Sequence, residues 1–165
     1  MNTGLSVLKT LDKIISSILK TLVVVLCIGI AVVLLFRVII RFTPVHFQIS
    51  WTDEIVEMMM AWMIFSASAE IMRDGGHFRV ELLQEKYAGQ KWVDYLNLFI
   101  SILGIIFIGT LLHYSIQLVQ KAVQFTPILK ISTKWLYASI PVNCAIMLIY
   151  LCRDAVNNVL KIVKK

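Results

Sequence analysis

The segment "TLVVVLCIGIAVVLLFRVII", residues 21–40, decides the fold class. It is twenty residues long and carries one charged side chain, Arg37. As an α-helix it would be about 30 Å long, which matches the thickness of the hydrocarbon core of a bilayer. Three more apolar segments follow it. We therefore predict four transmembrane spans, at about residues 21–41, 55–73, 93–118 and 134–152, with a kink at Pro141 in the last.

The composition agrees with a membrane protein. Of the 165 residues, 59% are hydrophobic and 16% are charged, whereas a soluble domain carries about 25% charged residues. We predict a single membrane domain over residues 1–165. The net charge of +6 fits basic flanks that orient membrane helices, so no nucleic-acid partner is expected. Cys27, Cys144 and Cys152 lack the spacing of a disulfide framework or a zinc site.

The basic residues are divided unequally between the two sides of the predicted membrane. Eleven flank the two termini and the connection between the second and third spans, and five flank the other ends. The positive-inside rule therefore predicts that both termini are cytoplasmic. The predicted fold is an all-α integral membrane protein with four transmembrane helices, amphipathic interfacial helices and both termini in the cytoplasm.

Two segments have the pattern of amphipathic helices. In residues 1–20, apolar side chains recur at helical spacing opposite a stripe of lysines. This lead-in is predicted either to lie on the cytoplasmic surface or to extend the first span. No A-x-A-like cleavage site follows it, which argues against a signal peptide. Residues 78–89 predict a short surface helix on the same side.

The second span raises a question because acidic residues stand at both of its ends. Glu57 and Glu70 would lie about 20 Å apart along a helix, so each must lie near a boundary of the roughly 30 Å hydrocarbon core. This spacing argues against a central ion or proton relay. Intramembrane ions usually pair, and the predicted structural charge pairs involve Arg37, Arg41, Glu54, Glu57, Glu70 and Arg73. A recognition site formed by Trp51, Asp53 and Glu54 is the alternative at the outer end.

Other features exclude an enzyme. The chain has no Ser–His–Asp or Cys–His arrangement and no phosphate-binding glycine loop. No catalytic, substrate-binding or metal site is predicted, and no cofactor is expected. Small residues at 66–69 predict close packing of the second span on another helix.

The order of these features resembles the small membrane subunit of tripartite ATP-independent periplasmic (TRAP) transporters. The matching positions are an Arg ending the first span, a "WTDE" entry to the second, a His in "RDGGHFRV", a Trp before the last span and an "IPV" within it. In this sequence they are Arg41, Trp51, Glu54, His77, Trp135 and Pro141. The resemblance covers about residues 10–155. It departs from the family at "SASAE", where a glycine would be expected.

The resemblance implies a supporting role in the bacterial inner membrane. In such transporters a periplasmic binding protein captures an organic acid and delivers it to a large membrane subunit, which holds the substrate and sodium sites. The small subunit would enlarge the scaffold of the large one and help dock the periplasmic protein, through Trp51, Asp53 and Glu54. Its partners would be these two proteins and membrane lipids. Sialic acid or a C4-dicarboxylate would be the substrate.

Three alternatives remain from the residues alone. A self-sufficient small four-helix transporter would need a carboxylate near the midplane. A membrane haem or quinone redox protein would use His46 and His113, both predicted on the outer side. A structural protein of another membrane complex would share the four spans but not the order of the motifs.

Overall fold

The computed structural model describes residues 2–42, 50–73 and 91–163. Four helices account for most of these residues: α1 (Asn2–Arg41), α2 (Trp51–Arg73), α4 (Lys91–Lys121) and α5 (Lys134–Val163). All four are long and apolar enough to cross a membrane. The prediction of an all-α protein with four membrane-spanning helices is therefore confirmed.

The helices extend past the apolar segments that predicted them. The lead-in and the first span form one continuous helix of 40 residues, so the lead-in extends the span. Helix α5 likewise continues through Pro141 and past Cys152 to Val163. The predicted surface helix at residues 78–89 lies outside the described residues.

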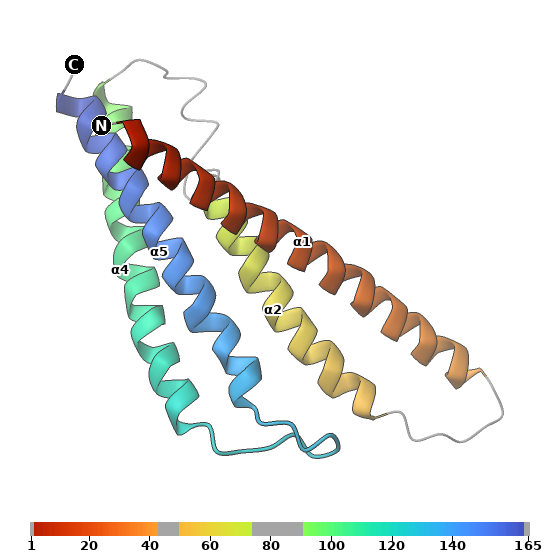
Figure 1. The fold of residues 1–165 in the computed structure, drawn as a ribbon. Coiled ribbons are helices and arrows are strands. Elements are labelled where there is room, and N and C mark those ends of the chain that lie inside the picture. Colours follow the sequence, from red (N-terminus) through yellow and green to blue (C-terminus); the bar gives the residue numbers. More distant parts are fainter. Residues whose placement is uncertain (1, 43–49, 74–90, 164–165) are drawn as a thin grey trace.

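The four helices stand in a row in the order α4, α5, α2, α1 (Figure 1). Helices α2 and α5 occupy the middle and run in the same direction. Trp62, in the middle of α2, contacts Trp135 at the start of α5, and Arg73, at the end of α2, contacts Arg153 farther along α5. The start of α1 and the end of α5 lie on the same side of the molecule, which is called the termini side below (Figure 1). The opposite side, where residues 122–133 join α4 to α5, is called the hairpin side.

Small and apolar residues hold the middle of the row together. The buried cluster includes Ala69 and Met72 of α2, and Cys144, Met147 and Leu151 of α5. Small side chains allow two helix backbones to approach closely, which is a main source of helix association in a membrane. Between α1 and α2, the tip of Met59 lies directly over Gly29.

Helices α4 and α5 are joined by the segment of residues 122–133, called the hairpin here. Phe125 and Ser132 face each other across it in an isolated antiparallel bridge, and Thr133 N–H donates to the Gln124 carbonyl at 3.1 Å. Near the other end of the pair, Asn158 Nδ2 donates to Ser101 Oγ at 3.3 Å. These two contacts fix the register of α4 against α5.

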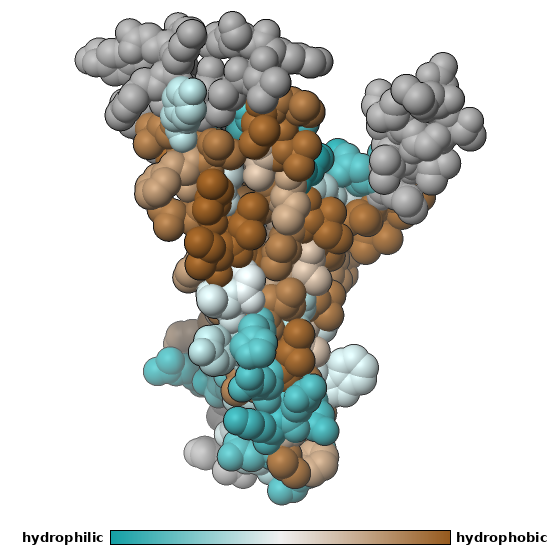
Figure 2. Space-filling view, turned by 90° about the vertical axis from the view of Figure 1, so that its left-hand side faces the viewer, coloured by the Kyte–Doolittle hydropathy of each residue, from teal (hydrophilic) through white to brown (hydrophobic). Residues whose placement is uncertain are grey.

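Much of the apolar surface remains uncovered. On α1, the exposed side chains include Val24, Val25, Ile28, Val32 and Leu35. On the face of the molecule that carries α4, a broad apolar region gives way to a polar one toward the hairpin side (Figure 2). A surface of this kind is suited to lipid or to another membrane protein.

Candidate functional site

The charged side chains that pair with one another form two clusters, one on the termini side and one on the hairpin side. The termini-side cluster comprises Asp12, Ser16, Lys20, Glu70, Arg73, Arg153 and Asp154. The hairpin-side cluster comprises Arg37, Asp53, Glu54 and the hairpin. Glu54 and Arg73 are about 28 Å apart along α2, close to the roughly 30 Å of a hydrocarbon core. The two clusters therefore fit the two boundaries of a membrane.

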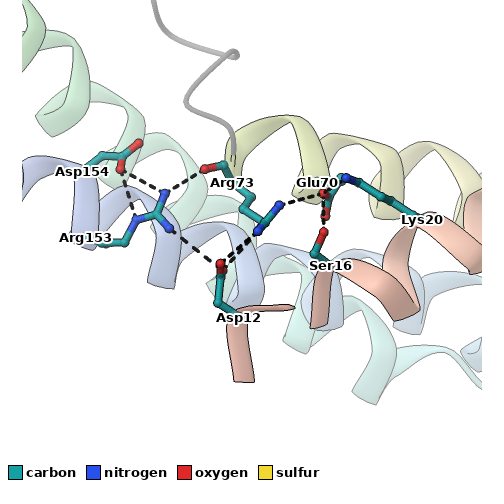
Figure 3. Close-up of polar contacts among 7 residues, drawn as sticks. All are labelled: Asp12, Ser16, Lys20, Glu70, Arg73, Arg153 and Asp154. Atoms are coloured by element: carbon teal, nitrogen blue, oxygen red, sulfur yellow. Dashed lines mark hydrogen bonds and ion pairs between the residues drawn. The ribbon is translucent and has the colours of Figure 1, made fainter. Parts of the chain in front are cut away.

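Arg73, the last residue of α2, is the centre of the termini-side cluster (Figure 3). Its Nε lies 3.2 Å from both carboxylate oxygens of Asp12 on α1, and its Nη2 donates to Asp12 Oδ2 at 3.0 Å. Its Nη1 lies 3.3 Å from Glu70 Oε1, one turn earlier on α2. This forked geometry is the strong form of an arginine–carboxylate pair.

Glu70 connects the same cluster to a second turn of α1. Its side chain is buried, with 9% of the residue surface exposed. Glu70 Oε1 accepts a hydrogen bond from Ser16 Oγ at 2.6 Å and lies 3.3 Å from Lys20 Nζ. A buried carboxylate is stable only when it is paired and hydrogen-bonded. These partners and Arg73 all contact Oε1, whereas Oε2 is buried with no hydrogen-bond partner among the described residues.

Arg153 adds α5 to the cluster. Its Nη2 donates to the backbone carbonyl of Arg73 at 2.7 Å and so satisfies a carbonyl that the end of α2 leaves open. Its Nη1 lies 4.0 Å from Asp12 Oδ1, and its guanidinium also contacts Asp154 at 3.3 Å. The guanidinium carbon stacks 5.1 Å from the centre of the Tyr150 ring. The termini-side cluster thus joins three helices.

On the hairpin side, Glu54 binds backbone rather than arginine. Its two carboxylate oxygens accept the N–H groups of Ile128 at 2.8 Å and Leu129 at 3.0 Å. Arg37 of α1 pairs instead with Asp53. Trp62 Nε1 donates to the Trp135 carbonyl at 3.0 Å. Helix α2 therefore contacts the hairpin through Glu54 and α1 through Asp53.

The structure brings some of the expected charge pairs together and separates others. Glu70 and Arg73 pair, and Arg37 pairs with the neighbour of Glu54. Within the described ranges, Arg41 and Glu57 form no ion pair. Trp51 is half-buried at the first residue of α2, and Trp135 is exposed at the start of α5. His77 lies outside the described residues.

Sequence reasoning missed the residues that complete the termini-side cluster. Asp12 was part of a basic lead-in, and Arg153 was counted only as an orienting charge. A signal was present, because Asp12 is the only acidic residue among the first 50. An isolated acid in a basic, membrane-proximal helix needs a partner, and only the tertiary fold shows that this partner is Arg73.

The chemistry of both clusters is that of structural ion pairing. In the part of the chain that the structure describes, no group of three or more His, Cys, Asp or Glu side chains is placed to hold a metal ion. His113 is hydrogen-bonded to Gln117 at 2.9 Å on the next turn of α4, and His46 lies outside the described residues. The arrangement positions helices rather than reacting groups.

Comparison with protein families identifies the chain. The family described as "Tripartite ATP-independent periplasmic transporters, DctQ component" matches residues 9–161. The chain belongs to the DctQ family. The resemblance inferred from the motifs is therefore confirmed, over nearly the same residues. A comparison with individual curated proteins gave no significant match.

DctQ is the small TRAP transporter component, so this chain is a transporter subunit and does not belong to an enzyme family. DctQ components work with a large membrane subunit and a periplasmic binding protein. Most of the positions that suggested the family lie at or near helix ends in this DctQ chain, whereas Pro141 lies inside α5. Arg41 ends α1, Trp51 begins α2, and Glu54 holds the hairpin.

Proposed function

We propose that this DctQ chain enlarges the fixed scaffold of a sodium-coupled transporter for an organic acid, either sialic acid or a C4-dicarboxylate. It does so in the bacterial inner membrane with both termini in the cytoplasm. The large membrane subunit carries the substrate and sodium sites. The observation that carries this proposal is the row of helices, because a layer one helix thick encloses no path for a solute.

The placement of charge supports the same role. Here the paired charges stand at the two ends of α2, where they join helices to one another. Such pairs stabilise a rigid element against which a partner subunit can move. They are not suited to a binding site that opens and closes.

We also propose that the hairpin side helps dock the periplasmic binding protein. Asp53 and Glu54 are engaged by Arg37 and by the hairpin backbone. Their contribution to docking would therefore be to hold the hairpin and Trp51 in one shape. Substitution of Asp53→Asn together with Glu54→Gln should weaken binding of the periplasmic protein while the two membrane subunits still co-purify. Unchanged binding and uptake would contradict this docking role.

Gentle solubilisation of the native membrane with a tag on this chain tests the main proposal. A large polytopic membrane protein should co-purify in a one-to-one ratio. Vesicles that contain both membrane subunits should accumulate the organic acid only when sodium and the periplasmic protein are present, and vesicles with this chain alone should not. Recovery of the chain by itself, with uptake by it alone, would instead support the self-sufficient transporter.

A further inference from the structure

Helix α4 carries a stripe of polar side chains on the face that points away from its neighbours. His113, Gln117, Gln120 and Lys121 recur at helical spacing, and all but the half-buried Gln117 are exposed. Ser115 and Ala122, on the opposite face of the same turns, are buried. These four residues are called the polar stripe below.

The same outward face is apolar toward the termini side. It presents Tyr95, Phe99, Ile102 and Ile106, which are all exposed. The chemistry of one continuous helix face therefore changes about halfway along α4. Figure 2 looks onto this side of the molecule and shows the change from apolar to polar surface.

The polar stripe begins well inside the apolar length of the neighbouring helix. The contacts at Gln124–Thr133 and Ser101–Asn158 place His113 and Gln117 at the level of residues 141–145 of α5. His113 thus lies about 17 Å along the axis from the start of α5. At that level α5 exposes an apolar side chain, that of Val142, which is 48% exposed.

This offset places polar groups at the depth of hydrocarbon. Since α4 and α5 are in direct contact, no tilt of the row brings their two apolar stretches to the same depth. A polar side chain in hydrocarbon without hydrogen-bond partners costs several kcal/mol. The bond between His113 and Gln117 satisfies only part of their hydrogen-bonding capacity. Lipid tails supply no further partner, so the polar stripe needs another polypeptide beside it.

We propose that the polar stripe of α4 is a contact face for the large membrane subunit, which supplies the polar groups that the stripe requires. This inference rests on the proposed function. The exposed apolar face of α1 is left to lipid. An aqueous gap beside the polar stripe would need the same neighbour, because this chain cannot wall a cavity on the outside of its own row.

Photo-crosslinking in the assembled transporter tests the proposal. p-Benzoylphenylalanine is placed at Gln117, and in a matched variant at Val142, which lies at the same level on α5. The Gln117 position should crosslink to the large subunit in the native membrane, and the Val142 position should give lipid adducts. Crosslinks from Gln117 to lipid, or to a second copy of this chain, would overturn the assignment. Co-purification of the subunits, measured in parallel, separates this failure from failure of the proposed function.

A pair of substitutions gives an independent readout. Gln117→Leu with Gln120→Leu should reduce the large subunit recovered with the tagged chain by roughly tenfold, the scale of one or two lost buried hydrogen bonds. The isolated variant should be at least as heat-stable in detergent as the parent, because leucine is better solvated there. Val142→Leu should change neither quantity. Full recovery of the large subunit by the double variant would contradict the proposal.

Discussion

Arg73 organises more of the molecule than its place at the end of α2 suggests. Its guanidinium holds Asp12 of α1 and Glu70 of its own helix, and its carbonyl receives Arg153 of α5. Such an arginine cannot be replaced by lysine without loss, because a lysine ammonium lacks the planar fork that engages two carboxylates.

A double-mutant cycle on Asp12 and Arg73 should reveal substantial coupling. Both side chains are largely buried, with 31% and 21% exposed, so their attraction is weakly screened. We expect a coupling free energy of about 1 kcal/mol or more between Asp12→Ala and Arg73→Ala. Reversible unfolding in lipid–detergent mixtures measures it.

The matched control is the pair of Arg37 and Asp53 on the hairpin side. Their side chains are 46% and 56% exposed, and exposed ion pairs contribute little. The corresponding cycle should give less than about 0.5 kcal/mol. Equal coupling at the two sites would show that burial does not set the strength of these pairs.

Glu54 should control the order of the hairpin. Glu54→Ala removes the acceptor of the Ile128 and Leu129 N–H groups, so these amides should exchange with deuterium faster than in the parent. Glu57→Ala is the control, because Glu57 lies one turn away, is exposed, and forms no ion pair among the described residues. Hydrogen exchange read by mass spectrometry checks both. Unchanged exchange in Glu54→Ala would mean that the hairpin is held by its own backbone bonds.

At the level of the elements, close packing of α1 on α2 depends on Gly29. A methyl group at Gly29 would collide with the tip of Met59, whereas one at Gly109 of α4 would meet open space. Gly109→Ala should therefore stabilise the protein by roughly 0.5–1 kcal/mol through helix propensity. Gly29→Ala should gain less, because Met59 must move.

Unfolding measurements of the two variants in the parent and in a Met59→Ala background test this reasoning. The difference between Gly29→Ala and Gly109→Ala should disappear once Met59 is truncated. A difference that persists would place the constraint on Gly29 elsewhere than at Met59.

The existence of the helices was predictable from sequence, and their full lengths were not. An apolar run of about 20 residues reports the hydrocarbon thickness. The polar turns that continue α4 to Lys121 and α5 to Val163 carry no such signal. The pairing of Glu70 with Arg73 follows from local helix geometry. The hydrogen bonds from Ile128 and Leu129 to Glu54 could not be predicted in this way, because they depend on how the hairpin, distant in sequence, packs against α2.

For the whole molecule, the order of the helices in the row could not be predicted from the sequence. Four apolar helices of similar composition fit a closed bundle as well as a row. The row follows from which helices are neighbours, α4 with α5, α5 with α2 and α2 with α1. The contacts that place α5 beside α2 join residues far apart in the sequence, such as Trp62 with Trp135 and Arg153 with the carbonyl of Arg73. The family motifs, in contrast, could be recognised from the sequence because they follow one another in a fixed order along the chain.

The row should depend on the termini-side cluster for its shape. Spin labels at Ile18→Cys on α1 and at the native Cys152 on α5 both occupy exposed positions close to this cluster. Cys27→Ala and Cys144→Ala remove the other two thiols. Pulsed electron–electron double resonance should give one narrow distribution of distances between the two labels for the parent protein in nanodiscs. Arg73→Ala should broaden it, because Asp12 loses the partner that ties α1 to α2.

Lys13→Ala provides the matched control for this experiment. Lys13 neighbours Asp12 on α1 and is exposed, and the described residues offer it no ion-pair partner. Its removal should leave the distance distribution narrow. If Arg73→Ala leaves it narrow as well, apolar packing of α2 between α1 and α5 fixes the row by itself. The termini-side cluster would then serve only to place paired charges at the membrane boundary.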